Sequence, residues 1–268
     1  MKAIATSRRS AINGVPARAT YSVNCPICAG RAVLPTSDFV LITCEHGGNR
    51  VPAEYRTLFR DYRALLDSHR GYDAGALKLA QELAAALNAP LVASTISRLL
   101  VDLNRSITHP HVFSPAVRNA SAELRERIIE RYYRPHRARV ERYVEQAVAR
   151  RQRVIHLACH SFTPTLDGVD RRADLGLLYD PARPGEVALC AQWKSVLVLQ
   201  VPGVVVRRNY PYLGKNDGLT TSLRRRFRPT AYVGVEIEIN QRHVFANAPA
   251  WRMLRRAIVQ SVRTTLEQ

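Results

Sequence analysis

Four short polar segments, each at the end of an apolar run or within one, constrain this chain most strongly. They read CEHGGN at 44–49, DLNR at 102–105, CHSFTP at 159–164 and VEIEIN at 235–240. The neighbouring runs FVLIT, RLLV, VIHLA and AYVGV have the composition of buried strands. Because ligands of α/β proteins bind where strands end, these polar segments are predicted to form one site from distant parts of the chain.

Strand-like and helix-like segments alternate from Asp38 to the C-terminus. Strands are expected at FVLIT, PLVAST, RLLVDL, VIHLACH, LGLLYD, VVVRRN and AYVGVEIEIN. Helices are expected at 52–66, 73–87 with Asp73 as candidate N-cap, 121–152, 182–196 and 249–266. This order predicts a three-layer α/β fold with a mixed, mostly parallel sheet and helices on both faces.

Length and composition favour one catalytic domain. With 268 residues, 46% of them apolar, the chain can bury one large core, expected over 37–268. Residues 1–36 are interpreted as a basic N-terminal extension without the apolar core of a secretory signal. No apolar run reaches the 18 or more residues of a membrane-spanning helix, so no membrane association is expected.

The five cysteines are an odd number without the spacing of a disulfide framework, which favours a reducing, cytoplasmic setting. Cys25 and Cys28 resemble half of a zinc-binding motif whose second half does not follow. Cys44 and Cys159 are interpreted as small residues packed at strand ends, although either could be a nucleophile.

The net charge of +18 permits binding to nucleic acid or other polyanions. The arginines are dispersed along the chain, although many lie in 120–153 and 224–228, and no recognised nucleic-acid-binding motif accompanies them. Nucleic acid is therefore not an expected partner, and the oligomeric state stays open.

Two histidines follow predicted strands and are candidate metal ligands. His46 is followed by Gly47 and Gly48, which would let the backbone approach a bound ion or substrate closely. A single histidine in such a turn is usually hydrogen-bonded and structural. His160 at a second strand end favours a zinc site instead, because both strands are expected to end at the same edge of the sheet.

Two further segments carry polar groups suited to substrate binding and proton transfer. Arg105 can grip a carboxylate with two hydrogen bonds and Asn104 can add a donor, although Arg105 could also pair with Asp102. Glu236 and Glu238 are two apart on a predicted strand and so share a face. Either could be a general base beside a metal, and an exposed edge strand is the alternative.

Together these segments resemble the N-formylglutamate amidohydrolase family, from about Asp38 to the C-terminus. The matching pieces are EHGGNRVP, HRGYDAGA, SRLLVDLNRS, HSFTP, RRNYPYLGKNDG and EINQRHVF. The resemblance implies a zinc-exopeptidase-like fold (phosphorylase/hydrolase-like), shared with zinc carboxypeptidases and aspartoacylases. It also implies one Zn²⁺ ion, a small anionic N-acyl amino acid such as N-formyl-L-glutamate as substrate, and a role in histidine degradation.

The resemblance also implies the metal ligands. Aspartoacylases read His-Gly-Asn-Glu where this chain reads His46-Gly-Gly-Asn49, so the matching glutamate is absent. Glu45 and Asp73 are the candidates for the missing carboxylate ligand, and Asn49 is a weaker one. His160 is similar to the third-ligand histidine of zinc carboxypeptidases.

The resemblance also implies a substrate-binding pair and a catalytic glutamate, and the hypothesised mechanism adds Arg208 and Arg98. Asn104 and Arg105 are similar to the pair that binds the substrate carboxylate, and Arg208 is expected to bind a second one. Glu238 is preferred over Glu236 as the catalytic glutamate that removes the proton of a zinc-bound water. Arg98 is expected to stabilise the developing oxyanion.

Two alternatives remain at this point. The same fold could act on another N-acyl amino acid, a short peptide or a cell-wall amide. The asparagine at position 49 also leaves room for a non-catalytic basic binding protein on this scaffold.

Overall fold

The structure, a computed structural model, describes residues 38–267. The predicted N-terminal extension and its junction with the catalytic domain, together with Cys25 and Cys28, lie outside the described residues. Within them, no helix is long and apolar enough to cross a membrane.

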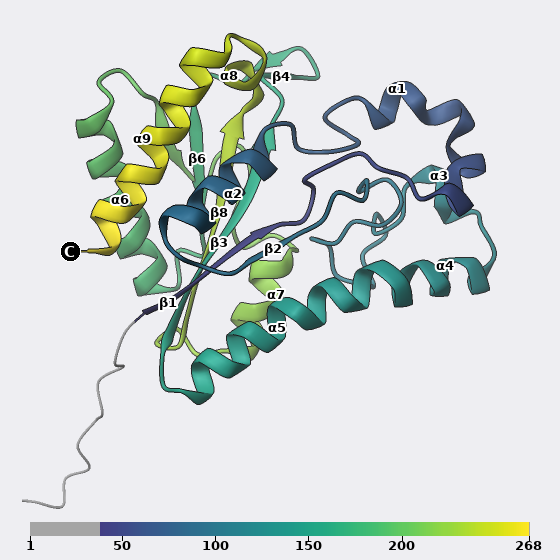
Figure 1. The fold of residues 1–268 in the computed structure, drawn as a ribbon, viewed down its shortest axis with the longest axis horizontal. Helices are drawn as coiled ribbons and strands as arrows, with labels where there is room; N and C mark the ends of the chain where they lie inside the picture. The colour runs from purple at the N-terminus through teal and green to yellow at the C-terminus, as the bar shows by residue number, and fades with distance from the viewer. Residues whose placement is uncertain (1–37, 268) are drawn as a thin grey trace, which may run out of the picture. The chain divides into compact units, whose positions relative to one another are not determined.

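A sheet of six strands forms the centre of the described chain (Figure 1). Its order is β2 (Leu91–Ala93), β1 (Asp38–Cys44), β3 (Arg153–Phe162), β8 (Tyr232–Asn240), β6 (Leu175–Leu178) and β7 (Val206–Arg208). All neighbouring pairs are parallel except β6 and β8. Two short strands, β4 (Thr165–Leu166) and β5 (Val169–Asp170), form a separate antiparallel pair. The predicted mixed, mostly parallel sheet is confirmed.

Helices cover both faces of the sheet. On one face lie α2 (Ala76–Ala86), α6 (Pro184–Gln200) and α9 (Ala248–Leu266). On the other lie α5 (Arg134–Ala149) and α7 (Leu219–Arg226), as Figure 1 shows. The predicted three-layer arrangement is therefore confirmed.

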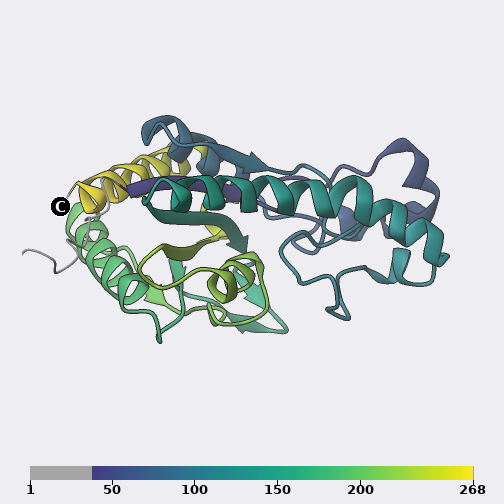
Figure 2. The same ribbon diagram turned by 90° about the horizontal axis from the view of Figure 1, so that it is seen from below.

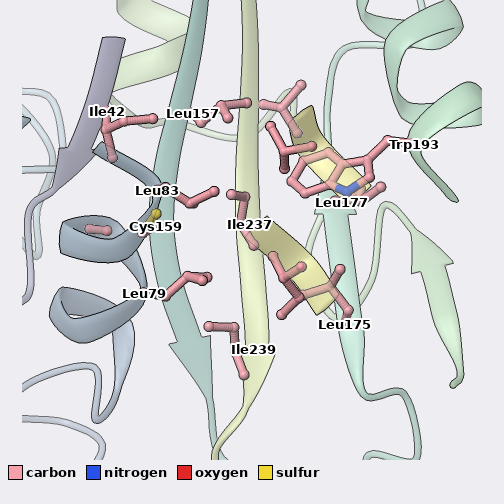
Figure 3. Packing of buried hydrophobic residues seen from close by; sticks show 14 of the residues in the cluster. Ile42, Leu79, Leu83, Leu157, Cys159, Leu175, Leu177, Trp193, Ile237 and Ile239 are labelled. Carbon is pink, nitrogen blue, oxygen red and sulfur yellow. The ribbon is translucent and has the colours of Figure 1, made fainter. Parts of the chain in front are cut away.

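The two-residue period of the central strands decides which side chains meet which layer. Odd-numbered residues of β3 and β8 join the core beneath α2, α6 and α9. Figure 3 shows Leu157 of β3 and Ile237 of β8 packed with Leu83 of α2. Even-numbered residues, including His160 and Glu238, consequently face the other side of the sheet.

The cysteines of the described chain are free and fully buried. Cys44 and Cys159 belong to the same apolar core, and burial raises the pKa of both thiols. Their interpretation as packed small residues is thus supported, since a nucleophile needs an accessible thiolate.

A second apolar cluster forms a side lobe beside the sheet, which we define as residues 50–72 and 96–133. It contains η2 (Ala53–Tyr62), α1 (Arg63–Leu66), α3 (Pro115–Arg118), α4 (Ala122–Ile128) and the π-helical turn η3 (Ile129–Tyr133). In Figure 2 the long helix from α4 through α5 runs from this lobe to the sheet.

The strand predicted at RLLVDL is wrong. Leu100, Val101 and Leu103 are buried, but they lie in turns within the core of the side lobe and pair with no strand. A short apolar run has the same appearance in a strand and in a buried irregular segment, and here the lobe core takes it.

The helix predictions hold in existence and shift at their ends. The predicted helix 73–87 begins only at Ala76, with Gly75 as N-cap at φ 81°, so Asp73 is not the cap. The predicted helix 121–152 does begin beside Ser121, whose hydroxyl accepts from Leu124 N at 3.2 Å, and η3 interrupts it. The prediction missed α3, α7 and α8 (Gln241–Phe245).

Asp174, just before β6, joins three parts of the fold. Its carboxylate accepts from Val205 N at 2.7 Å, from His243 Nε2 at 2.5 Å and from Arg242 Nη2. Burial alone would raise the pKa of Asp174, but these donors outweigh it and lower the pKa to about 2.

We predict that Asp174→Asn lowers the free energy of unfolding at pH 7 by about 1–3 kcal/mol, since charged donors lose their ionised acceptor. The folded pKa of about 2 lies below the ordinary value of 3.8, so this stabilisation is present above that value and is lost as the pH falls toward 2. Urea denaturation of variant and wild type should therefore give a difference that shrinks on acidification. Asp61→Asn, at an exposed position, is the control, and a difference independent of pH would contradict the prediction.

Candidate metal and substrate site

A cavity of about 390 Å³ opens where β1, β3 and β8 reach the side lobe. Its walls combine the strand residues His160 and Glu238 with lobe residues such as Arg98 and Arg105. This volume lies within the range of about 300–1,000 Å³ of small-molecule pockets. The two predicted histidines and the two predicted glutamates all line it.

Three buried side chains converge on its floor. Asp73 Oδ2 lies 2.9 Å from His160 Nδ1 and 3.4 Å from His46 Nδ1. The imidazole centroids are 5.1 Å apart, and one ligand atom from each of the three residues lies within 4.8 Å of the others. His46 follows β1, His160 lies near the end of β3, and Asp73 precedes α2, so distant segments build this cluster.

Each imidazole is backed by a second carboxylate on its far nitrogen. His46 Nε2 lies 2.7 Å from Asp102 Oδ1, and His160 Nε2 lies 3.2 Å from Glu45 Oε2. Such partners fix the ring orientation and make Nδ1 the nitrogen that faces the cluster.

Arg98 links the carboxylate of Asp73, in the cluster, to that of Asp102 behind it. Its Nη2 donates to Asp102 Oδ2 at 2.8 Å and its Nη1 to Asp73 Oδ1 at 3.4 Å. Burial by itself would raise the pKa of both carboxyl groups, but Arg98 and His46 hold them well below their usual range. Arg98 also lines the cavity, so its predicted contact with the substrate stays a prediction.

The cluster fits a zinc ion chemically. Two imidazole nitrogens and one carboxylate oxygen form a common zinc ligand set that leaves one position for water or substrate. Asp73 supplies the carboxylate, while Glu45 lies behind His160 rather than in the cluster. Asn49 is not near it, since its Nδ2 donates to Asp67 Oδ1 at 3.0 Å on the surface.

The predicted role of Gly47 and Gly48 needs correction. A Cβ at Gly47 would lie 2.9 Å from Ser94 O, and one at Gly48 would lie 2.8 Å from Thr95 O. The glycines therefore allow close packing against the chain that follows β2, and this contact rather than an ion or substrate explains them.

The two glutamates of β8 differ in their partners. Glu236 Oε1 accepts from Thr220 Oγ1 at 2.5 Å. Glu238 lies opposite His160 in the β3–β8 register, is 6% exposed, and its Oε2 has no hydrogen-bond partner among the described residues. Burial, together with the nearby charges of Asp73 and Glu236, raises the pKa of Glu238 to about 8. Glu238 therefore keeps a buried oxygen that a ligand of the cavity can contact.

Asn104 and Arg105 are held at the cavity by the loop before α7. Asn104 Oδ1 accepts from Leu219 N at 2.7 Å, which leaves its amide donors for a ligand. Arg105 Nη1 donates to the backbone oxygen of Asp217 at 3.2 Å, and no described carboxylate forms an ion pair with Arg105. The alternative pairing of Arg105 with Asp102 is therefore not observed.

One predicted substrate-binding arginine lies away from the cavity, and two arginines that were not predicted line it. Arg208 is exposed on the edge strand β7 and is not among the residues that line the cavity, so its predicted contact with a second carboxylate is not supported. Arg70 and Arg118 of the side lobe do line the cavity and were missed. They lie in irregular or short helical segments, where no sequence period singles them out.

Known proteins resemble this chain in sequence and in fold. The family model described as N-formylglutamate amidohydrolase matches residues 39–245. The crystal structure of a gene product from Agrobacterium tumefaciens is similar with a TM-score of 0.73 and 27% identity, covering 87% of this chain and 92% of that one. No curated protein matches.

The fold has a further solved counterpart. The crystal structure of N-formylglutamate amidohydrolase from Ralstonia eutropha is similar with a TM-score of 0.65 and 22% identity, covering 87% of this chain and 95% of that one. This likeness shows the fold alone, and the α/β fold expected from the sequence is confirmed.

We predict that the purified protein binds one zinc ion per chain, because the cluster offers one set of converging ligands. His46→Ala and His160→Ala should each lower zinc affinity by more than the 10- to 100-fold (about 1.4–3 kcal/mol) that loss of a ligand's outer partner typically costs. Metal analysis and competition with a chelator measure this. His69→Ala, which alters a histidine of the cavity wall outside the cluster, should bind zinc like the wild type. A double variant that lacks both imidazoles and still binds zinc would contradict the assignment.

Proposed function

Because this chain belongs to the N-formylglutamate amidohydrolase family, we propose that it is a zinc-dependent hydrolase of small N-acyl amino acids, with N-formyl-L-glutamate as the leading substrate. The observation that carries the proposal is the His46–Asp73–His160 cluster on the floor of a cavity that Glu238 also lines. A cation site beside a free carboxylate oxygen is the arrangement that amide hydrolysis needs.

The two imidazoles and Asp73 would hold the zinc ion. When bound there, zinc supplies polarisation of a carbonyl oxygen and lowers the pKa of water. The chain itself supplies a buried floor, since all three residues are no more than 3% exposed.

Glu238 is proposed as the proton carrier. Its Oε2 has no other partner in the described chain and shares the cavity with His160. Beside a zinc ion in the cluster the ionised form of Glu238 would be favoured, and its carboxylate could then accept a proton from the attacking water and return it to the leaving nitrogen. Glu236 accepts a hydrogen bond from Thr220, and its proposed role is structural, beside Glu238, rather than proton transfer.

The cations of the cavity support an anionic substrate. Arg105 and Asn104 present donors beside the cluster, and Arg70 and Arg118 stand at the lobe side of the same cavity. Within the described residues none of these three arginines has an ion pair with a carboxylate, so each can donate hydrogen bonds to an anionic group of a ligand. The proposed partner is therefore a small N-acyl amino acid whose carboxylate reaches Arg105.

We predict that Glu238→Gln lowers kcat for N-formyl-L-glutamate by about 10²- to 10⁴-fold, since proton transfer is lost while shape is kept. Glu236→Gln should lose much less activity. Release of formate from zinc-loaded enzyme measures both, and zinc content checks that the cluster is intact. Greater damage from Glu236→Gln would reverse the two roles, and a zinc-loaded wild type that hydrolyses no N-acyl amino acid would refute the proposal.

We predict that Arg105→Ala lowers kcat/KM for N-formyl-L-glutamate by about 10- to 100-fold, mainly through KM, because a charge-assisted hydrogen bond is lost. Arg208→Ala, at an exposed position outside the cavity, is the matched control and should keep the wild-type constants. A substrate panel should include N-acetyl amino acids and a carboxyl-amidated analogue, on which the Arg105 effect should disappear. An equal effect on the amidated analogue would argue against carboxylate binding.

A further inference from the structure

Behind the metal cluster, His160 is followed by two buried side chains that the proposed reaction does not use. The carboxylate of Glu45 is fully buried, with His160 Nε2 at 3.2 Å on one side and His136 Nε2 at 3.7 Å on the other. Neither Glu45 nor His136 lines the cavity, so neither can contact a substrate there. We call His160, Glu45 and His136 the buried row.

The chemistry of His160 explains one half of this row. An imidazole that binds a cation through Nδ1 keeps its proton on Nε2, and a buried N–H needs an acceptor. Glu45 offers the nearest carboxylate to this nitrogen. This contact would fix the ring of His160 with Nδ1 turned toward Asp73.

The same argument requires a partner for Glu45 itself. A fully buried carboxylate is costly unless donors or cations surround it, and neither oxygen of Glu45 has a hydrogen bond within the described residues, so its two neighbouring imidazoles are the groups able to compensate its charge. Asp102, the corresponding partner of His46, is held from outside by Arg98 at 2.8 Å. For Glu45 the outer group is His136, so the two halves of the site are built alike, with a different cation-capable group at each end.

The position of His136 is itself fixed by the helix that carries it. His136 lies in the first turn of α5, directly after the π-helical turn η3, and is 8% exposed. From the same stretch, Tyr133 Oη donates to Arg105 O at 2.8 Å and Arg137 Nη1 to Leu103 O at 3.4 Å. These contacts hold the helix against the site, and π-helical turns frequently occur at such places.

Resting on the zinc site of the proposed function, we propose that His136 is a positioning residue, which acts through Glu45 to hold His160 in its metal-binding orientation. It touches neither substrate nor metal. Loss of its imidazole would leave Glu45 free to turn, and His160 would lose the fixed carboxylate that orients its ring.

The test compares zinc affinity, measured by competition with a chromophoric chelator, for wild type, His136→Leu, His136→Gln and Glu45→Gln. The visible spectrum of the Co²⁺-loaded protein reports ligand geometry independently of activity. Glu45→Gln should lose about 10- to 100-fold in zinc affinity and His136→Leu about tenfold, with a changed Co²⁺ spectrum in both. His136→Gln retains a donor and should recover most of the loss.

His243→Leu is the matched control, because it removes another imidazole that contacts a buried carboxylate, Asp174, in a different part of the fold. It should lower stability and leave zinc affinity and the Co²⁺ spectrum unchanged. Wild-type zinc affinity in His136→Leu, or an equal loss in His243→Leu, would overturn the inference. A wild type that binds zinc but hydrolyses no amide would overturn only the proposed function, and one that binds neither zinc nor Co²⁺ would overturn both.

Discussion

The carboxylate of Asp73 lies between two imidazoles, one just after β1 and one in β3, and the geometry of the site follows from that contact. Besides its contacts with His46 and His160, this carboxylate accepts a hydrogen bond from Arg98 Nη1 at 3.4 Å. The backbone N–H of Asp73 donates to His46 O at 2.9 Å. A carboxylate that is 3% exposed is stable only among such donors or beside a cation. Because Asp73 lies between the side lobe and α2, its contacts tie the lobe to the strand ends.

The sheet and the side lobe contribute different chemistry to the cavity. The strands supply groups that must be placed rigidly, His160 and Glu238, and their register sets them opposite each other. The lobe supplies Asp102 and the cations, among them Arg105, which the hydroxyl of Tyr133 holds by its backbone oxygen. A rigid sheet edge with a substrate-binding wall from elsewhere is common in α/β enzymes.

Sequence reasoning succeeded where a period or a strand end gave a signal. Alternation along β8 placed Glu236 and Glu238 on one face, and both predicted histidines line one cavity. It failed at RLLVDL, since burial in the lobe core imitates a strand, and it could not choose between Glu45 and Asp73. Both are acids close to a histidine, and only the chain's path shows which one faces Nδ1.

What the amino-acid order fixes here comes from local patterns. These are the strand and helix periods, whose alternation predicts the three-layer fold, and the residue types able to hold zinc and move protons. The partnerships are not local. Asp73 with His160, and His136 with Glu45, join residues 87 and 91 positions apart. No periodicity specifies such pairs, because they arise from the packing of the lobe and the long helix against the sheet edge, where burial makes each unpaired polar atom costly.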